Sequence, residues 1–85
     1  MSYVVRINMV NGTNYGCVSK INNVNVDDII GEQYQSYSDL LDKVVFKITD
    51  TTNKPFVYIK DDNKGHFEIN TAHICAVELA PKMGR

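Results

Sequence analysis

The sequence predicts a small α+β domain built as an antiparallel β-meander with one inserted amphipathic helix. Three observations support this fold class. Apolar and polar residues alternate in short segments at both ends of the chain, turn-forming residues separate these segments, and one stretch in the middle repeats its apolar residues at helical spacing. With 85 residues, the chain is expected to form a single domain that spans residues 1–85.

The best-defined segment is a hairpin between Pro55 and Asn70. Its apolar residues alternate with polar or mixed neighbours in two runs, and the loop 61–65 (Asp-Asp-Asn-Lys-Gly) contains turn formers and a glycine. One register places all the alternating apolar side chains on a single face, and a slip of one residue would scatter them. The predicted pairs are Lys60–His66, Ile59–Phe67 and Val57–Ile69.

A second hairpin is expected at the start of the chain, around Asn11-Gly12. A two-residue turn there would leave Tyr15 and Cys17 on the wrong face, whereas a three-residue loop with Gly12 in the left-handed conformation aligns the apolar residues. Gly16 then lies on the outer face, where it permits a bend. The predicted pairs are Met9–Thr13, Ile7–Tyr15, Val5–Cys17 and Tyr3–Ser19.

The middle of the chain predicts helices. Apolar residues recur at one helical face at Tyr37, Leu40, Leu41, Val44, Val45 and Ile48, with Ser36 or Ser38 as N-cap. A helix is predicted for Ser38 to about Val45. The segment from Val44 to Thr49 is rich in β-branched residues, so the sequence leaves open whether it continues the helix or forms a strand after a shorter helix. Before it, Val26–Ile30 followed by Gly31 is consistent with a single helical turn.

The remaining elements complete a barrel-like shape. Residues 50–53 are predicted as loop, Asn70 to Ala72 as a single turn, and Ile74 to Leu79 as a strand that Pro81 ends. Cys75, Val77 and Leu79 are expected on one side of that strand. A helix that plugs one side of a curled sheet predicts an SH3-like or split barrel.

Composition narrows the classes of protein. Apolar content of 44% and charged content of 22% are typical of a folded domain, and a net charge of −1 gives no long-range attraction for nucleic acid or an anionic membrane. No apolar run is long enough to span a bilayer, and the first residues lack the pattern of a signal peptide. A cytoplasmic protein without a membrane partner is expected. Its two cysteines, Cys17 and Cys75, are then predicted to be free, buried thiols.

The motifs resemble those of small uncharacterised proteins of low-GC Gram-positive bacteria and their phages. The resemblance covers the opening hydrophobic-NG-x-x-Y hairpin, Val5 to Tyr15, and the closing pattern F-x-x-I…I-x-T-x-x-I-x-x-V-E, Phe56 to Glu78. It implies a phage, prophage or mobile-element accessory protein and brings no catalytic residues. The hairpin also resembles the start of an Sm-type RNA-binding fold, but the sequence Glu68-Ile69-Asn70-Thr71 stands where an Arg-Gly signature is expected.

No motif indicates catalysis, a cofactor or a metal site. The available soft or borderline metal ligands, Cys17, His66, His73 and Cys75, lack paired spacing of the C-x-x-C kind. The acidic loop 61–65 lacks the alternating ligands and the distal glutamate of a calcium loop. A non-enzymatic protein is therefore predicted, with a hairpin turn and isolated side chains at these positions.

Two kinds of partner remain. Tyr58, Lys60, His66 and Glu68 lie on the outward face of the Pro55–Asn70 hairpin, where an aromatic residue with a charged rim suits a protein partner. An unpaired sheet edge offers self-association instead. The alternative is a small-barrel nucleic-acid-binding protein, Sm-like or SH3-like, in which lysines gather at one end and Tyr58 or Phe56 stacks on bases. Interleaved aspartates and the net charge disfavour this alternative. Its lysines are Lys43, Lys47, Lys54, Lys60 and Lys64.

Overall fold

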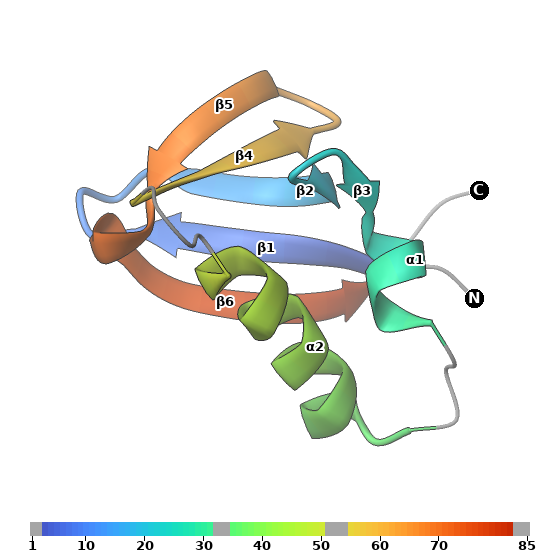
Figure 1. Cartoon of the computed structure of the whole chain (residues 1–85). Coiled ribbons are helices and arrows are strands. Elements are labelled where there is room, and N and C mark those ends of the chain that lie inside the picture. Colours follow the sequence, from blue (N-terminus) through green and yellow to red (C-terminus); the bar gives the residue numbers. More distant parts are fainter. Residues whose placement is uncertain (1–2, 32–34, 51–54, 83–85) are drawn as a thin grey trace.

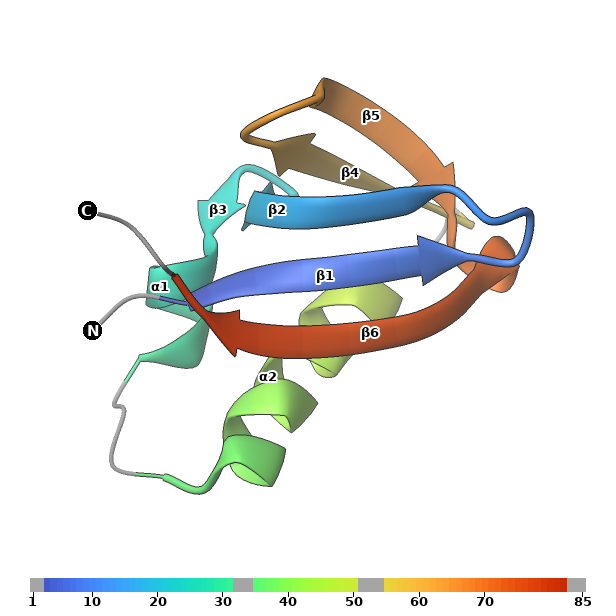
Figure 2. The same cartoon turned by 180° about the vertical axis from the view of Figure 1, so that it is seen from behind.

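The structure, a computed structural model, describes residues 3–31, 35–50 and 55–82. A curled sheet has one helix lying against it near β1 and β6 and a shorter helix at the end where β1 begins (Figure 1; Figure 2). The elements in chain order are β1 (Tyr3–Met9), β2 (Asn14–Ile21), β3 (Val24–Asn25), α1 (Val26–Ile30), α2 (Tyr37–Thr49), β4 (Phe56–Asp61), β5 (Gly65–Asn70), the 3₁₀ turn η1 (Thr71–His73) and β6 (Ile74–Pro81).

The six strands form one antiparallel sheet in the order β5-β4-β2-β1-β6, with β3 paired to β2. The last strand therefore returns to pair with the first. Within the described residues, β5 and β6 each pair on one side and do not pair with each other, so the sheet is not closed. The α+β class with an antiparallel sheet is confirmed, whereas a barrel is not. The sheet departs from a simple meander, because β6 follows β5 in the chain but lies at the opposite edge, beside β1.

The β4–β5 hairpin has the predicted register. Lys60 pairs with His66, and the apolar pairs Ile59–Phe67 and Val57–Ile69 point their side chains inward. Gly65 has a φ of 109°, the left-handed conformation that the tight loop requires. The alternation of the sequence was enough to fix this pairing because both strands bury one face only.

The β1–β2 hairpin follows its prediction as far as Tyr15. Gly12 has a φ of 94°, the Met9 amide donates to the Thr13 carbonyl at 2.8 Å, and Ile7 pairs with Tyr15. Beyond Gly16 a bulge shifts the register, so Val5 pairs with Val18. The predicted pairs Val5–Cys17 and Tyr3–Ser19 are wrong because one extra residue of β2 is accommodated in the bulge.

The cysteines are free, as predicted, but they are not core residues. Cys17 is half-buried in the bulge of β2, and Cys75 is exposed. In β6 the register shifts between Ala76, which pairs with Asn8, and Ile74, which pairs with Met9. Cys75 is the extra residue at this irregularity, so it does not share the inward face with Leu79.

The two helices have the predicted positions. Gly31 ends α1 with a φ of 68°, and the Ser36 hydroxyl caps α2 by accepting a hydrogen bond from the Asp39 amide at 3.3 Å. The segment from Val44 to Thr49, which the sequence left open between helix and strand, is helical. Its helical face continues the apolar repeat and buries Ile48.

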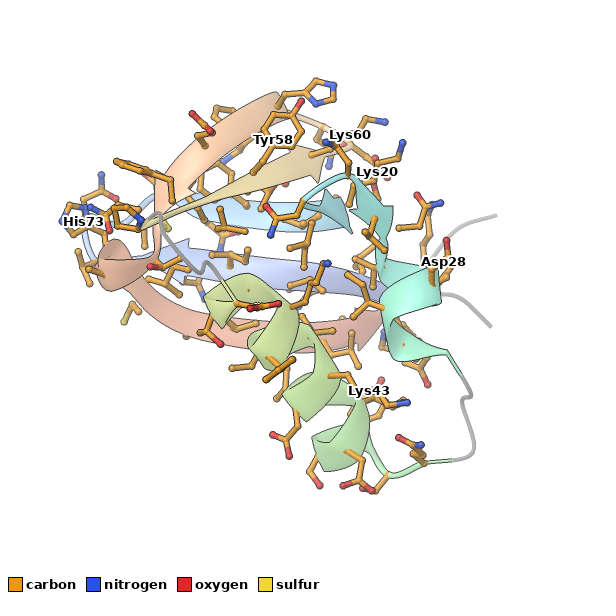
Figure 3. The ribbon with its side chains drawn as sticks, in the orientation of Figure 1. Lys20, Asp28, Lys43, Tyr58, Lys60 and His73 are labelled. Atoms are coloured by element: carbon orange, nitrogen blue, oxygen red, sulfur yellow. The ribbon has the colours of Figure 1, made fainter. Side chains whose placement is uncertain are left out.

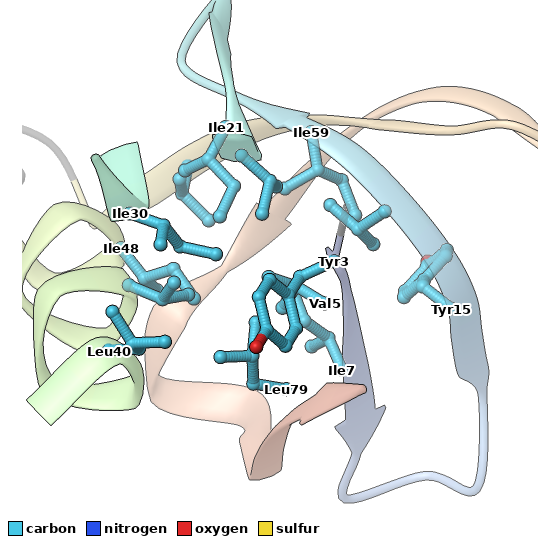
Figure 4. Packing of buried hydrophobic residues seen from close by; sticks show 14 of the residues in the cluster. Tyr3, Val5, Ile7, Tyr15, Ile21, Ile30, Leu40, Ile48, Ile59 and Leu79 are labelled. Atoms are coloured by element: carbon cyan, nitrogen blue, oxygen red, sulfur yellow. The ribbon is translucent and has the colours of Figure 1, made fainter. Parts of the chain in front are cut away.

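A single apolar core joins the sheet to both helices. Sheet residues with no exposed surface cluster with buried residues of both helices (Figure 4). They are Val5, Ile7, Val18, Ile21, Val57 and Ile59 of the sheet, Val26 and Ile30 of α1, and Leu40, Val44 and Ile48 of α2. The Lys43 ammonium also donates to the Ile30 carbonyl at 2.9 Å, which satisfies the end of α1 and ties it to α2. No helix in the described ranges combines the length and the apolar character that a membrane crossing requires.

Candidate functional site

The side chains predicted to bind a partner lie together on the outer face of β4 and β5. Tyr58 is directly opposite Glu68, and Lys60 is directly opposite His66. Their inward neighbours on the same strands are core residues, so these four project away from the core. We call Tyr58, Lys60, His66 and Glu68 the outer face.

Two of these side chains hold each other in place. The Tyr58 hydroxyl and His66 Nδ1 are 2.7 Å apart, and their rings stack with centroids 5.7 Å apart at an interplanar angle of 23°. His66 is exposed and Tyr58 is half-buried. A surface pair joined by a hydrogen bond and by stacking has lost much of its rotamer freedom before any partner binds.

The backbone of Tyr58 is also fixed, by a contact that the sequence did not reveal. Asn22, in the turn between β2 and β3, has a positive φ of 51°. The side-chain oxygen of Asn22 accepts a hydrogen bond from the backbone amide of Tyr58 at 3.1 Å, and the backbone amide of Asn22 donates to the Tyr58 carbonyl at 2.7 Å. The turn therefore continues the hydrogen bonding of β4 where β2 ends.

Lys60 contacts a small polar network at the margin of the outer face. Its ammonium is 3.6 Å from the Asp62 carboxylate, which also lies 3.9 Å from the Lys82 ammonium and accepts a hydrogen bond from the Ser19 hydroxyl at 2.7 Å. The side chains of the ion pairs are about one-third to one-half exposed, so each pair contributes little to stability.

A third strand extends the surface. Lys20 of β2 pairs directly with Lys60 of β4, and Figure 3 shows both beside Tyr58. Lys20 could not be assigned to this surface from the sequence, because the register between β2 and β4 depends on an irregularity between Val18 and Lys20. The pairing of Lys20 with Lys60 in the structure is what places Lys20 on this surface.

Asp61, predicted as part of a surface turn, is buried, with 1% of its surface exposed. One carboxylate oxygen accepts the Cys17 amide at 3.0 Å, and the other accepts the Asn63 and Lys64 amides at 2.8 and 2.9 Å. Its oxygens are thus used to join the β4–β5 loop to the bulge of β2. This bonding gives Asp61 a structural role.

The residues considered as metal ligands are dispersed. Cys75 is exposed on β6, His73 is exposed on η1, and His66 is bonded to Tyr58. Among the residues that the structure describes, no three His, Cys, Asp or Glu side chains are grouped so that they could hold a metal ion.

The lysines of the nucleic-acid hypothesis do not form one group. Lys43 projects from α2 and bonds to α1, far from Lys60 on β4 (Figure 3). Lys64 donates to the Asn14 carbonyl and lies 5.5 Å from the centre of the Tyr15 ring, a cation–π contact. Lys47 is on α2, and Lys54 lies outside the described residues.

A groove of about 310 Å³ lies where β1 begins, between β2 and α1. Ser19 and Lys82, both contacts of Asp62, contribute to its lining, and so do Asp27 and Asp28. Asp27 also accepts a hydrogen bond from the Tyr3 amide at 3.3 Å. The groove therefore adjoins the network that Lys60 contacts, and its far side is acidic.

Comparison with known proteins assigns no family. No protein-family model matches the chain, and no curated protein or solved structure matches it either.

Proposed function

We propose that the chain is a non-enzymatic accessory protein that binds another protein through the outer face. The observation that carries this proposal is the Tyr58–His66 pair, fixed at 2.7 Å on an open sheet surface. Aromatic residues with a polar tip are enriched in protein interfaces, where they supply contact area and directional bonds together. A tyrosine held beside charged residues is suited to that role.

Preorganisation strengthens the argument. Ordering a flexible side chain on binding costs about 0.5–1.5 kcal/mol. The hydrogen bond and the ring stacking with His66 order the Tyr58 side chain in the free protein, which reduces this cost, and the two bonds to Asn22 fix the backbone of Tyr58. The outer face is therefore a better anchor than Phe46, which is 71% exposed on α2 and has no ring partner in the described part of the chain.

Two finer expectations belong to the same proposal. An SH3-like type of sheet is supported by the antiparallel pairing of the last strand with the first. Origin in a phage or mobile element rests on the sequence resemblance alone. Neither is needed for the binding test.

The test is selection from a random peptide library displayed on phage, with the purified chain immobilised. We expect peptides that bind the wild type and lose binding to the double variant Tyr58→Ala, His66→Ala. The matched control is Phe46→Ala, His73→Ala, which removes the same kinds of side chain from exposed positions on α2 and η1. Peptides that bind both double variants equally would contradict the assignment of the outer face.

Self-association is a second candidate, favoured by the two open edges of the sheet. In the described residues β5 and β6 have a neighbour on one side only, which leaves backbone groups free to pair with another chain. Size-exclusion chromatography with light scattering tests this candidate. A dimer or larger ring supports edge pairing, and a monomer at every concentration contradicts it. Strong nucleic-acid absorbance in the same peak would favour the nucleic-acid alternative instead.

A further inference from the structure

The outer side of the sheet carries a row of basic side chains across three strands. Lys20 of β2 pairs with Lys60 of β4, which pairs in turn with His66 of β5. The Cβ atoms of directly opposite residues in an antiparallel sheet lie about 4.5–5.5 Å apart. We call Lys20, Lys60 and His66 the basic row. Two of its members are lysines at directly opposite positions of neighbouring strands.

The positive charge of the basic row is only partly balanced. Like charges directly opposite each other are unfavourable. In the described part of the chain, Lys60 has one carboxylate within 4.0 Å, that of Asp62 at 3.6 Å, and Lys82 shares that carboxylate. No ion pair involving Lys20 is found among these residues. An added anion at this place would offset the repulsion expected between the charges of two directly opposite lysines.

We propose that the partner segment bound at the outer face is acidic and that its carboxylates bind the basic row. This inference rests on the proposed protein-binding function and specifies the chemistry of the partner. Charge complementarity supports it. The spacing of the basic row also supports an acidic partner. The row crosses three strands and is about 10 Å long, and alternate residues of an extended peptide are about 7 Å apart, so two carboxylates of one peptide fit along it.

His66 adds a directional donor. When the Tyr58 hydroxyl donates to Nδ1, the neutral ring carries its proton on Nε2, and the protonated ring carries one there as well. Because His66 is exposed, that N–H can donate to a carboxylate. The Tyr58–His66 pair thus orients the third member of the basic row toward an anion.

An acidic peptide fits this surface better than a nucleic acid does. Glu68 lies opposite Tyr58, and Asp62 lies beside Lys60, so negative groups border the basic row on the same surface. A nucleic acid has a phosphate at every nucleotide and would bring charge close to both carboxylates. A peptide can place carboxylates over the row and neutral or basic residues over Glu68 and Asp62.

The test measures binding of two labelled probes, hexaglutamate and oligothymidylate, to the folded protein at low and at moderate salt. We expect hexaglutamate to bind and to bind roughly tenfold more weakly to Lys20→Gln, Lys60→Gln. The single control Lys47→Gln removes one lysine from α2 and should leave binding unchanged, whereas Lys20→Gln alone should weaken it. Circular dichroism confirms that each variant is folded.

Each other outcome overturns the inference. Hexaglutamate binding that is insensitive to Lys20 and Lys60, or absent, contradicts it, and binding of oligothymidylate alone through these lysines assigns the surface to a nucleic acid. The peptide library separates the two proposals. Neutral or basic peptides selected through the intact outer face leave the protein-binding function standing and overturn only the acidic partner, whereas absence of peptides that depend on Tyr58 and His66 overturns both.

Discussion

Asp61 shows how one side chain can organise parts of the chain that are far apart in sequence. Its carboxylate accepts three amide hydrogen bonds, one of them from Cys17, which is 44 residues away. A buried carboxylate is costly unless its oxygens are bonded, and here both are. The Asp61 contacts hold the β2 bulge and the β4–β5 loop in their observed conformations.

Asp61→Ala should lower the free energy of unfolding by about 3 kcal/mol, because it leaves three partly buried amides without their acceptor. Asp61→Asn should cost less, since its oxygen can still accept from Asn63 and Lys64 while its amide faces the Cys17 N–H. Urea unfolding measures the free energy of unfolding of each variant and so ranks the two substitutions. Asp62→Ala, which removes a more exposed carboxylate next to it, is the control and should change stability by no more than about 0.5 kcal/mol. Equal effects at both positions would contradict the role of Asp61.

Lys20→Gln should stabilise the protein slightly, by about 0.3–0.5 kcal/mol, because it removes a like charge directly opposite Lys60. Lys20→Arg keeps the charge and should give no gain. Thermal unfolding at low salt measures both variants, and the difference should shrink when salt is added. A loss of stability in Lys20→Gln would mean that Lys20 has a structural role that the pairing does not explain.

At the scale of elements, the sequence predicts the features that depend on residues close together in the chain. The β4–β5 register, the three-residue loop with Gly12 and the two helices follow from alternation, turn residues and periodicity within a few residues. The position of Cys17 in the β2 bulge, outside the core, and the inclusion of Lys20 in the basic row could not be predicted. Both depend on irregularities in β2, one in its pairing with β1 and one in its pairing with β4. The same limit explains the exposed Cys75, at an irregularity opposite Met9.

The helix α2 gives an element-scale prediction that separates helix from strand. Ile48 has 1% of its surface exposed and Phe46 has 71%, as expected for a helix. In a strand, residues two apart would share a face. Ile48→Ala should therefore cost about 3 kcal/mol, through lost burial and a cavity, and Phe46→Ala less than about 0.5 kcal/mol. Denaturant titration measures both, and similar large costs would favour a strand.

For the whole molecule, β1 lies between β2 and β6, so the first and last strands are neighbours. The radius of gyration is 12.0 Å, and a compact chain of this length is expected to have about 12 Å. One apolar cluster includes residues of the sheet and of both helices. The outer side of the sheet remains free of this core, which is why polar and basic side chains can be placed there without disturbing the fold.

A shared core predicts that the sheet and α2 unfold together. Far-ultraviolet circular dichroism should follow mainly α2. Tyrosine fluorescence of a Tyr34→Phe, Tyr37→Phe variant, which keeps Tyr3, Tyr15 and Tyr58, should follow the sheet, and the two urea transitions should coincide. Leu40→Ala, which removes a side chain with 1% exposure, should lower both midpoints equally, whereas Asp42→Ala on the exposed side of α2 should shift neither. If Leu40→Ala shifted the helix signal alone, α2 would be a separately unfolding unit, and the outer face would then belong to a sheet that is stable without it.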